Sequence, residues 1–213
     1  MVTALKLREI LGADVINYQQ VINILGSYKK PRDKISRMLA SGELIRLKKG
    51  LYIFGDKLRR APIDRFHLAN LIYGPSYVSF ETALSYYGFI PERVESIVSA
   101  TTGKSKKFTT PLGLFTYRKQ ASFYYQEGIT LVEGSWGNVL MATPEKALSD
   151  QLMTVRASKI NTQQELKKYL LEDLRIDLKE LQKLEITSLK KIAQASGLAL
   201  LELLVECVKS KKK

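Results

Sequence analysis

The sequence predicts an α+β protein that begins with short helices and a basic hairpin, continues through a mixed α/β region and ends in helices. Three patterns support this fold class. Apolar residues recur at helical spacing near the start, segments typical of strands lie between residues 94 and 142, and the apolar patterns after residue 162 are helical. A chain of 213 residues, 45% hydrophobic and 26% charged, can form one large or two small domains.

The segment from Pro31 to Phe54 carries the clearest local pattern. Proline suits the first turn of a helix, because its missing N–H would have no partner there. Ile35, Met38 and Leu39 follow with the spacing of a buried stripe, and Gly42 is typical of a helix end. The spacing predicts a helix whose opposite face is polar and basic.

A hairpin is predicted directly after this helix. Apolar and basic residues alternate over residues 45–48, as in a half-buried strand, and Lys49-Gly50 is a typical hairpin turn before the returning strand at 51–54. A helix followed by a basic hairpin is the plan of a winged helix-turn-helix. In that plan the helix enters the major groove and the hairpin follows the phosphates.

Two earlier helices complete the predicted N-terminal domain. Residues 4–11 form the first, with Leu7, Ile10 and Leu11 directed inward, and Asn17 is a good N-cap for the second. We expect this domain to span residues 1–60, with the polar segment GDKLRRAP at 55–62 as a solvated linker. Residues 61–213 would form an α/β domain with a helical part from about residue 160 to 208 and a basic tail.

Positive charge is concentrated in the first domain. The net charge of +13 favours an anionic partner, nucleic acid first and an anionic membrane second. Residues 27–50 include eight basic and only two acidic residues. This excess favours a DNA-binding surface over a surface whose lysines are merely solvated. The predicted residues for double-stranded DNA are Lys29, Lys30, Arg32, Lys34, Ser36, Arg37, Arg46, Lys48 and Lys49.

Within this set, two groups have different expected roles. Ser36 and Arg37 should lie nearest the bases, whereas the lysines at 29, 30, 48 and 49 should contact phosphates. Winged-helix proteins usually bind two half-sites, so we expect inverted repeats in the operator and two protomers on it.

The second domain contains several recognisable elements. Ser79 is expected to cap a helix, and Thr143-Pro144-Glu145 is a strong helix start. Thr162 with Glu165 forms a capping box. Strands are predicted at residues 94–101, 114–117, 129–132 and 139–142, a basic loop at 102–110, and helical stripes that include Leu174, Leu178 and Leu181.

No catalytic or metal site is predicted. The run Gly103-Lys104-Ser105 lacks the earlier glycine that a phosphate-binding loop requires, since Val98 stands there. His67 is the only histidine and is expected to be structural, and the single cysteine excludes an internal disulfide. Neither a signal peptide nor a membrane span is expected, so a cytoplasmic location follows, and no cofactor is implied.

Four stretches of the chain resemble the AbiEi family, the antitoxins of AbiE-type abortive-infection toxin–antitoxin pairs. They are ISRMLASGELIRLKKGLYIF (35–54), YVSFETALSYYGFIPE (77–92), SIVSATTGKSKKFTTPLGLFTYR (96–118) and MATPEKALSDQL (141–152). The resemblance implies an N-terminal winged helix that represses its own operon and an α/β domain that carries antitoxin activity. It also implies a nucleotidyltransferase-like toxin encoded alongside and neutralised without a stable complex.

Two other functions fit parts of the sequence. The first is a winged-helix regulator without a toxin partner, whose second domain binds a ligand or a protein. The second is an enzyme acting on nucleic acid, which would need clustered carboxylates. Glu145 and Asp150 do not supply them, because residues five apart on a helix do not share a face.

Overall fold

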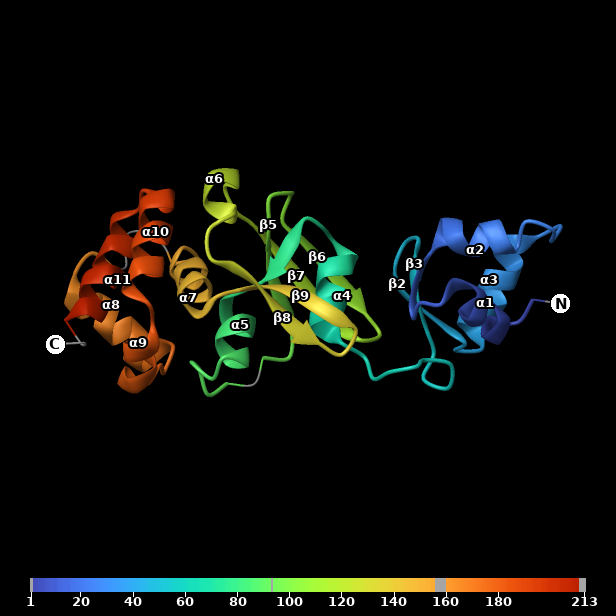
Figure 1. The fold of residues 1–213 in the computed structure, drawn as a ribbon, viewed down its shortest axis with the longest axis horizontal. Helices are drawn as coiled ribbons and strands as arrows, with labels where there is room; N and C mark the ends of the chain where they lie inside the picture. The colour runs from blue at the N-terminus through green and yellow to red at the C-terminus, as the bar shows by residue number, and fades with distance from the viewer. Residues whose placement is uncertain (1, 93, 156–159, 211–213) are drawn as a thin grey trace.

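The computed structural model describes residues 2–92, 94–155 and 160–210. The molecule is elongated, with the N-terminal helices at one end, the C-terminal helices at the other and a large sheet between them (Figure 1). The predicted fold class is confirmed: an N-terminal helical unit with a small sheet precedes a mixed α/β region and a helical C-terminal segment.

The N-terminal unit combines three helices with a three-stranded antiparallel sheet of order β1-β3-β2. Its elements are α1 (Ala4–Leu11), β1 (Val15–Asn17), α2 (Tyr18–Ile24), α3 (Pro31–Ala40), β2 (Leu44–Lys48) and β3 (Leu51–Phe54). The Asn17 cap is confirmed, since its side chain and that of Gln20 form a reciprocal capping box. Strand β1 was not predicted, because three residues carry no readable alternation.

One inward residue of α1 was predicted wrongly. Ala4 and Leu7 are buried, but the Ile10 side chain is 55% exposed. On an ideal helix Ile10 lies roughly 90° from the centre of the face formed by Ala4, Leu7 and Leu11. It therefore sits at the border of the buried stripe.

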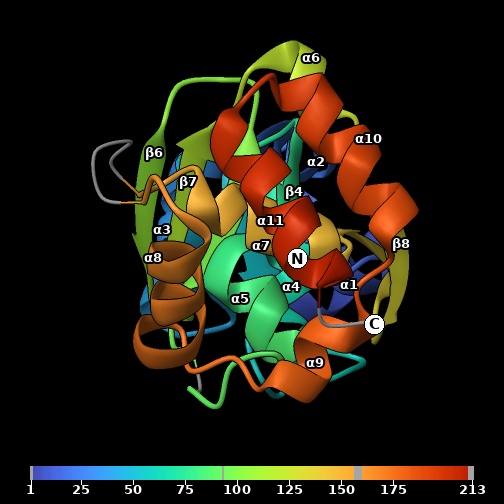
Figure 2. The same ribbon diagram turned by 90° about the vertical axis from the view of Figure 1, so that its left-hand side faces the viewer.

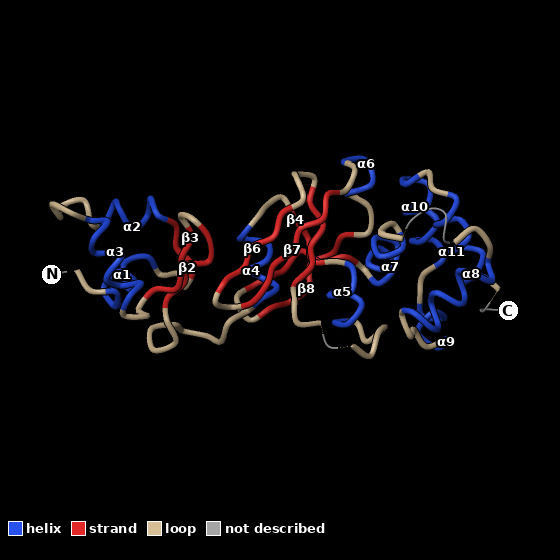
Figure 3. The backbone as a smooth tube through the Cα atoms, turned by 180° about the vertical axis from the view of Figure 1, so that it is seen from behind, coloured by secondary structure: helices blue, strands red, loops and turns tan. Residues whose placement is uncertain are grey.

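The central region is a six-stranded mixed sheet of order β6-β7-β5-β4-β9-β8. Helix α4 lies on the face turned toward the N-terminal unit, and α5 and α7 lie on the face turned toward the C-terminal helices (Figures 1 and 3). The elements are α4 (Arg65–Ile72), β4 (Ser76–Val78), α5 (Phe80–Tyr86), β5 (Ile97–Thr101), β6 (Lys106–Thr110), β7 (Gly113–Lys119), α6 (Ser122–Tyr125), β8 (Ile129–Gly134), β9 (Gly137–Ala142) and α7 (Pro144–Leu152).

Two local predictions in this region need correction. Half of the predicted basic loop is strand β6, which pairs with β7 from Lys106 opposite Tyr117 to Thr110 opposite Gly113. The strand lies at a sheet edge, where lysines are tolerated because one side faces solvent. Ser79 occupies the N-cap position of α5, yet its hydroxyl donates to Asp150 instead of capping the helix.

The C-terminal part is helical, as predicted. It contains α8 (Gln163–Lys168), a π-helical turn (Tyr169–Asp173), α9 (Leu178–Lys183), α10 (Ile186–Ser196) and α11 (Ala199–Lys209). The capping box of Thr162 and Glu165 is confirmed. Leu178 was expected in a buried stripe, but it begins α9 and is 38% exposed. Residues 211–213 of the predicted basic tail lie outside the described residues.

Candidate nucleic-acid interface

Helix α3 is anchored by its apolar stripe and turns a polar face outward. Ile35 and Met38 are 4% and 1% exposed and pack in the core of the N-terminal unit. On the opposite side Ser36 and Arg37 are exposed. Pro31 occupies the first turn, as its fixed backbone angle favours. The local sequence therefore fixes both the start of the helix and the direction of its face.

Seven of the nine predicted DNA-binding side chains are exposed. They lie before α3, on α3 and on the β2–β3 hairpin: Lys29, Lys30, Arg32, Ser36, Arg37, Arg46 and Lys49. Lys34 is half-buried. The Arg32 Nε donates to the Tyr18 hydroxyl over 3.1 Å, and this bond raises the pKa of the guanidinium.

Lys48 lies differently from the prediction. It is half-buried, and its Nζ donates to the carbonyl oxygen of Ile72 at the end of α4. The last carbonyls of a helix lack intrahelical partners and carry partial negative charge, so the ammonium caps α4. Burial lowers the pKa of Lys48, and the nearby Lys106 lowers it further. Lys48 is thus engaged with the second domain rather than presented to solvent.

The hairpin is also not a free arm, because both faces of its sheet are covered. Tyr52 and Phe54 pack in the N-terminal core, whereas Leu47 and Ile53 belong to the core of the second domain. Side chains alternate across a strand, so β3 supplies both cores with successive residues. The Lys49-Gly50 turn is tied down as well, since the Gly50 carbonyl accepts from the Tyr18 amide over 2.9 Å.

The segment predicted to be a solvated linker is attached to the N-terminal unit. The Arg59 guanidinium donates to the Phe54 carbonyl over 3.0 Å, and that of Arg60 donates to the Gly12 carbonyl over 3.1 Å. In return, the Arg8 guanidinium donates to the Leu58 carbonyl over 2.8 Å. Arginine donors fill backbone acceptors that a surface loop would leave to water, so this prediction of a free connector is wrong.

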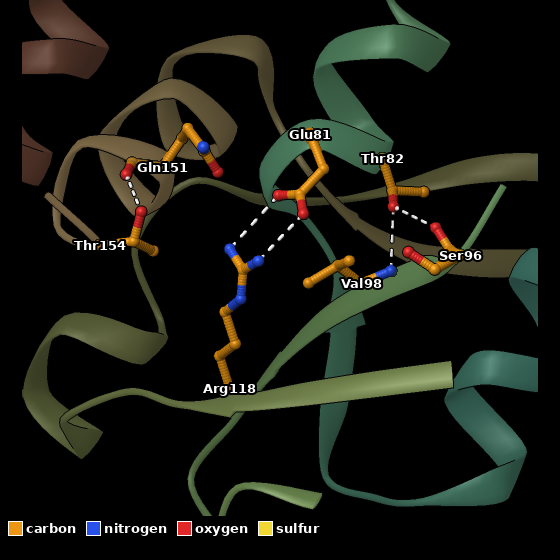
Figure 4. Close-up of polar contacts among 7 residues, drawn as sticks. All are labelled: Glu81, Thr82, Ser96, Val98, Arg118, Gln151 and Thr154. Carbon is orange, nitrogen blue, oxygen red and sulfur yellow. Dashed lines mark hydrogen bonds and ion pairs between the residues drawn. The ribbon is translucent and has the colours of Figure 1, made fainter. Parts of the chain in front are cut away.

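In the second domain, an acidic partner neutralises the charge of Arg118. Arg118 on β7 makes a two-pronged contact with Glu81 on α5, at 2.9 and 3.3 Å (Figure 4). Its guanidinium also lies over the Phe80 ring. The same view shows Thr82 joining α5 to β5 through the amide of Val98. Paired in this way, Arg118 adds little free positive charge to the hollow of about 510 Å³ that it lines with Lys106 and Lys107.

A buried charged cluster joins α7 to the sheet. The Asp150 carboxylate accepts from the hydroxyls of Ser79 and Tyr77 and lies 3.6 Å from the Lys146 Nζ, which donates to the Tyr124 carbonyl over 2.6 Å. Neither charged side chain is exposed. Burial lowers the pKa of Lys146 to about 8 and raises that of Asp150. The cluster therefore joins α7 to the sheet without access to solvent.

Sequence reasoning missed this cluster, although a signal was present. Lys146 and Asp150 are four apart on α7, the spacing at which helical side chains share one face. Their neighbours Ala147 and Leu148 are fully buried. Among the described residues, no group of three or more potential ligands could hold a metal ion.

The order of elements and the geometry of α3 define the class of this protein. Three helices with a β1-β3-β2 sheet, in the order α1-β1-α2-α3-β2-β3, form a winged helix-turn-helix, with β2 and β3 as the wing. Residues 5–55 match the family model described as transcriptional regulator, AbiEi antitoxin. The match confirms the resemblance found in the sequence over this part of the chain. A comparison with curated proteins found no match.

No helix within the described residues combines the length and the apolar character that a membrane crossing requires.

Proposed function

We propose that the protein represses its own operon by binding double-stranded DNA, with α3 in the major groove and the exposed tip of the wing on the backbone. The observation that carries this proposal is the polar, basic face of α3, held outward by Ile35 and Met38. Arg37 supplies a base-reading donor set and Lys49 a phosphate contact. The proposed surface consists of Lys29, Lys30, Arg32, Lys34, Ser36, Arg37, Arg46 and Lys49.

Two adjacent lysines provide a matched test of this surface. Lys49 is exposed at the wing tip, and Lys48 is held by Ile72. Binding to the protein's own promoter is measured by fluorescence anisotropy across a salt series. Lys49→Ala should lower the magnitude of the salt slope by about 0.9, because one phosphate contact is lost, whereas Lys48→Ala should leave the slope unchanged.

Arg37→Ala tests base reading by the same assay. A bidentate contact to a base contributes about 1–3 kcal/mol of discrimination, so this variant should bind operator and random DNA more equally. The proposed surface is wrong if Arg37→Ala and Lys49→Ala both leave affinity and salt dependence unchanged. Footprinting should also reveal two half-sites in inverted repeat.

We further propose that the protein is the antitoxin of an AbiE-type pair and neutralises a nucleotidyltransferase-like toxin, with activity in the second domain. The family match of residues 5–55 supports this role. A fragment starting at Ala61 is a poor test, because Leu47 and Ile53 fill the core of the second domain. The full-length Arg37→Ala/Lys49→Ala double variant should lose repression and still rescue cells that express the neighbouring toxin gene. Failure of the unaltered protein to rescue growth would refute the antitoxin role and favour a regulator without a toxin.

A further inference from the structure

Strand β8 forms an open edge of the six-stranded sheet. Strands β6 and β8 lie at opposite edges, on opposite sides of the molecule in Figure 2, and β8 pairs with β9 alone. The backbone of Leu140 on β9 donates to and accepts from the Asn70 side chain over 2.8 and 3.3 Å. Those groups therefore point away from β8. In an antiparallel pair the opposite residue behaves alike, so the N–H and C=O of Leu131 face the open edge.

The residues at this edge are unusually apolar for a strand that faces solvent. Leu131 is 60% exposed, and Leu140, opposite it in register, is 42% exposed, so the two side chains form a pair on one face. The other edge strand, β6, carries the exposed Lys106 and Lys107. Lysines on an edge discourage further strand pairing, and β8 has none.

Charge also distinguishes this surface from the rest of the chain. The protein has 34 lysines and arginines among 213 residues, yet none lies between Lys119 and Lys146, a segment that contains α6, β8 and β9. Strand β8 itself carries one charged residue, Glu133. Two molecules that each carry +13 repel one another through most of their surfaces. Two copies that meet through their β8–β9 hairpins would bring no basic side chains of these strands together.

We propose that a second copy of this chain pairs with this edge, β8 against β8, antiparallel across a two-fold axis at Leu131. This register pairs all three outward-facing residues: Leu131 with its own equivalent, and Ile129 with Glu133 of the second copy. The two Glu133 carboxylates are thereby kept apart. A self-complementary patch is what a closed dimer requires, and the contact joins both sheets into one of twelve strands.

Sedimentation velocity of the full chain without DNA tests the proposal. The unaltered protein should sediment at micromolar concentration with about twice the 24.1 kDa mass of one chain. Leu131→Lys should weaken the dimer at least about tenfold, because it brings two positive charges together on the axis. The matched control is Leu178→Lys on α9, a leucine of 38% exposure, which should leave the dimer intact.

Salt separates this association from DNA binding. Added salt screens the repulsion between two basic molecules and should strengthen the dimer, whereas it weakens binding to phosphates. The circular dichroism spectrum of Leu131→Lys should match that of the unaltered protein, since the side chain is largely exposed in a single copy and its replacement should not unfold the chain. A monomeric unaltered protein, or a Leu131→Lys variant that dimerises as strongly, would overturn the proposal. Neither result would bear on repression by the wing and α3.

Discussion

Replacing Ile53 tests whether the wing contributes side chains to two hydrophobic cores. It lies in β3 of the winged helix, its side chain has no exposed area, and it packs in the core of the second domain. Ile53→Ala removes three carbons from a site closed on both sides, which should cost about 2–5 kcal/mol of unfolding free energy. At roughly 2–4 °C per kcal/mol for a chain of this length, a loss of about 3 kcal/mol lowers Tm by about 6–12 °C.

Ile16→Ala is the matched control. Ile16 lies on the neighbouring strand β1, is 1% exposed and faces the opposite core, with α1, α2 and α3. The two variants therefore remove the same atoms from the two faces of one sheet. Hydrogen exchange monitored by mass spectrometry distinguishes them, because local opening raises exchange where packing is lost.

The increase in hydrogen exchange caused by Ile53→Ala should extend into the second domain. Ile53→Ala should raise exchange in α4 and β6, although the substitution lies in the winged helix, because Lys48 and the hairpin contact these elements. Ile16→Ala should raise exchange mainly in the three N-terminal helices. A loss below about 1 kcal/mol for Ile53→Ala, or increased exchange confined to α1, α2 and α3, would show that the wing is not shared.

Two further predictions concern the buried lysine and a close backbone contact. Burial lowers the pKa of Lys146 to about 8 from 10.5, so the unfolded chain binds more protons in that range, and its contribution to the unfolding free energy should rise with pH. Urea unfolding at a series of pH values should show this rise in the unfolding free energy of the unaltered protein relative to that of Lys146→Met. Parallel curves of unfolding free energy against pH for the two proteins would contradict the prediction. A Cβ on Gly55 would lie 2.0 Å from the Gly42 carbonyl oxygen, so Gly55→Ala should cost about 1–3 kcal/mol or more in thermal unfolding. Gly26→Ala, whose nearest atom is 3.5 Å away, should change stability little, and equal effects of the two substitutions would refute the steric reasoning.

Local signals predicted the helices and caps well, because those signals reside in a few neighbouring residues. The N-cap at Asn17, the capping box at Thr162 and the start of α7 at Thr143 are all present. Strand β6 was missed because its lysines are read as a loop until its edge position is known. Ser79 shows the same limit: its position at the helix start was readable, but Asp150, its partner, lies 71 residues away.

In the candidate interface too, the features set by neighbouring residues could be predicted from the sequence, and those set by distant residues could not. The outward direction of Ser36 and Arg37 follows from helical periodicity, since Ile35 and Met38 on the same helix must be buried. The fate of Lys48 does not follow from any local pattern. Alternation assigns it to the solvent face of an isolated hairpin, and only the packing of β2 on the second domain brings α4 within its reach.

The shared sheet determines which substitutions can separate the proposed repression from the proposed antitoxin activity. Changes on the outer face of α3 should remove the proposed DNA contacts and leave both cores intact, because Ser36 and Arg37 have no part in either. Changes at Leu47 or Ile53 cannot do so, since each residue belongs by sequence to the winged helix and by packing to the second domain. Lys48 belongs to neither group of positions. Its replacement leaves the Ile72 carbonyl at the end of α4 without its donor. A DNA-binding defect in Lys48→Ala would therefore indicate altered packing between the domains rather than a lost phosphate contact.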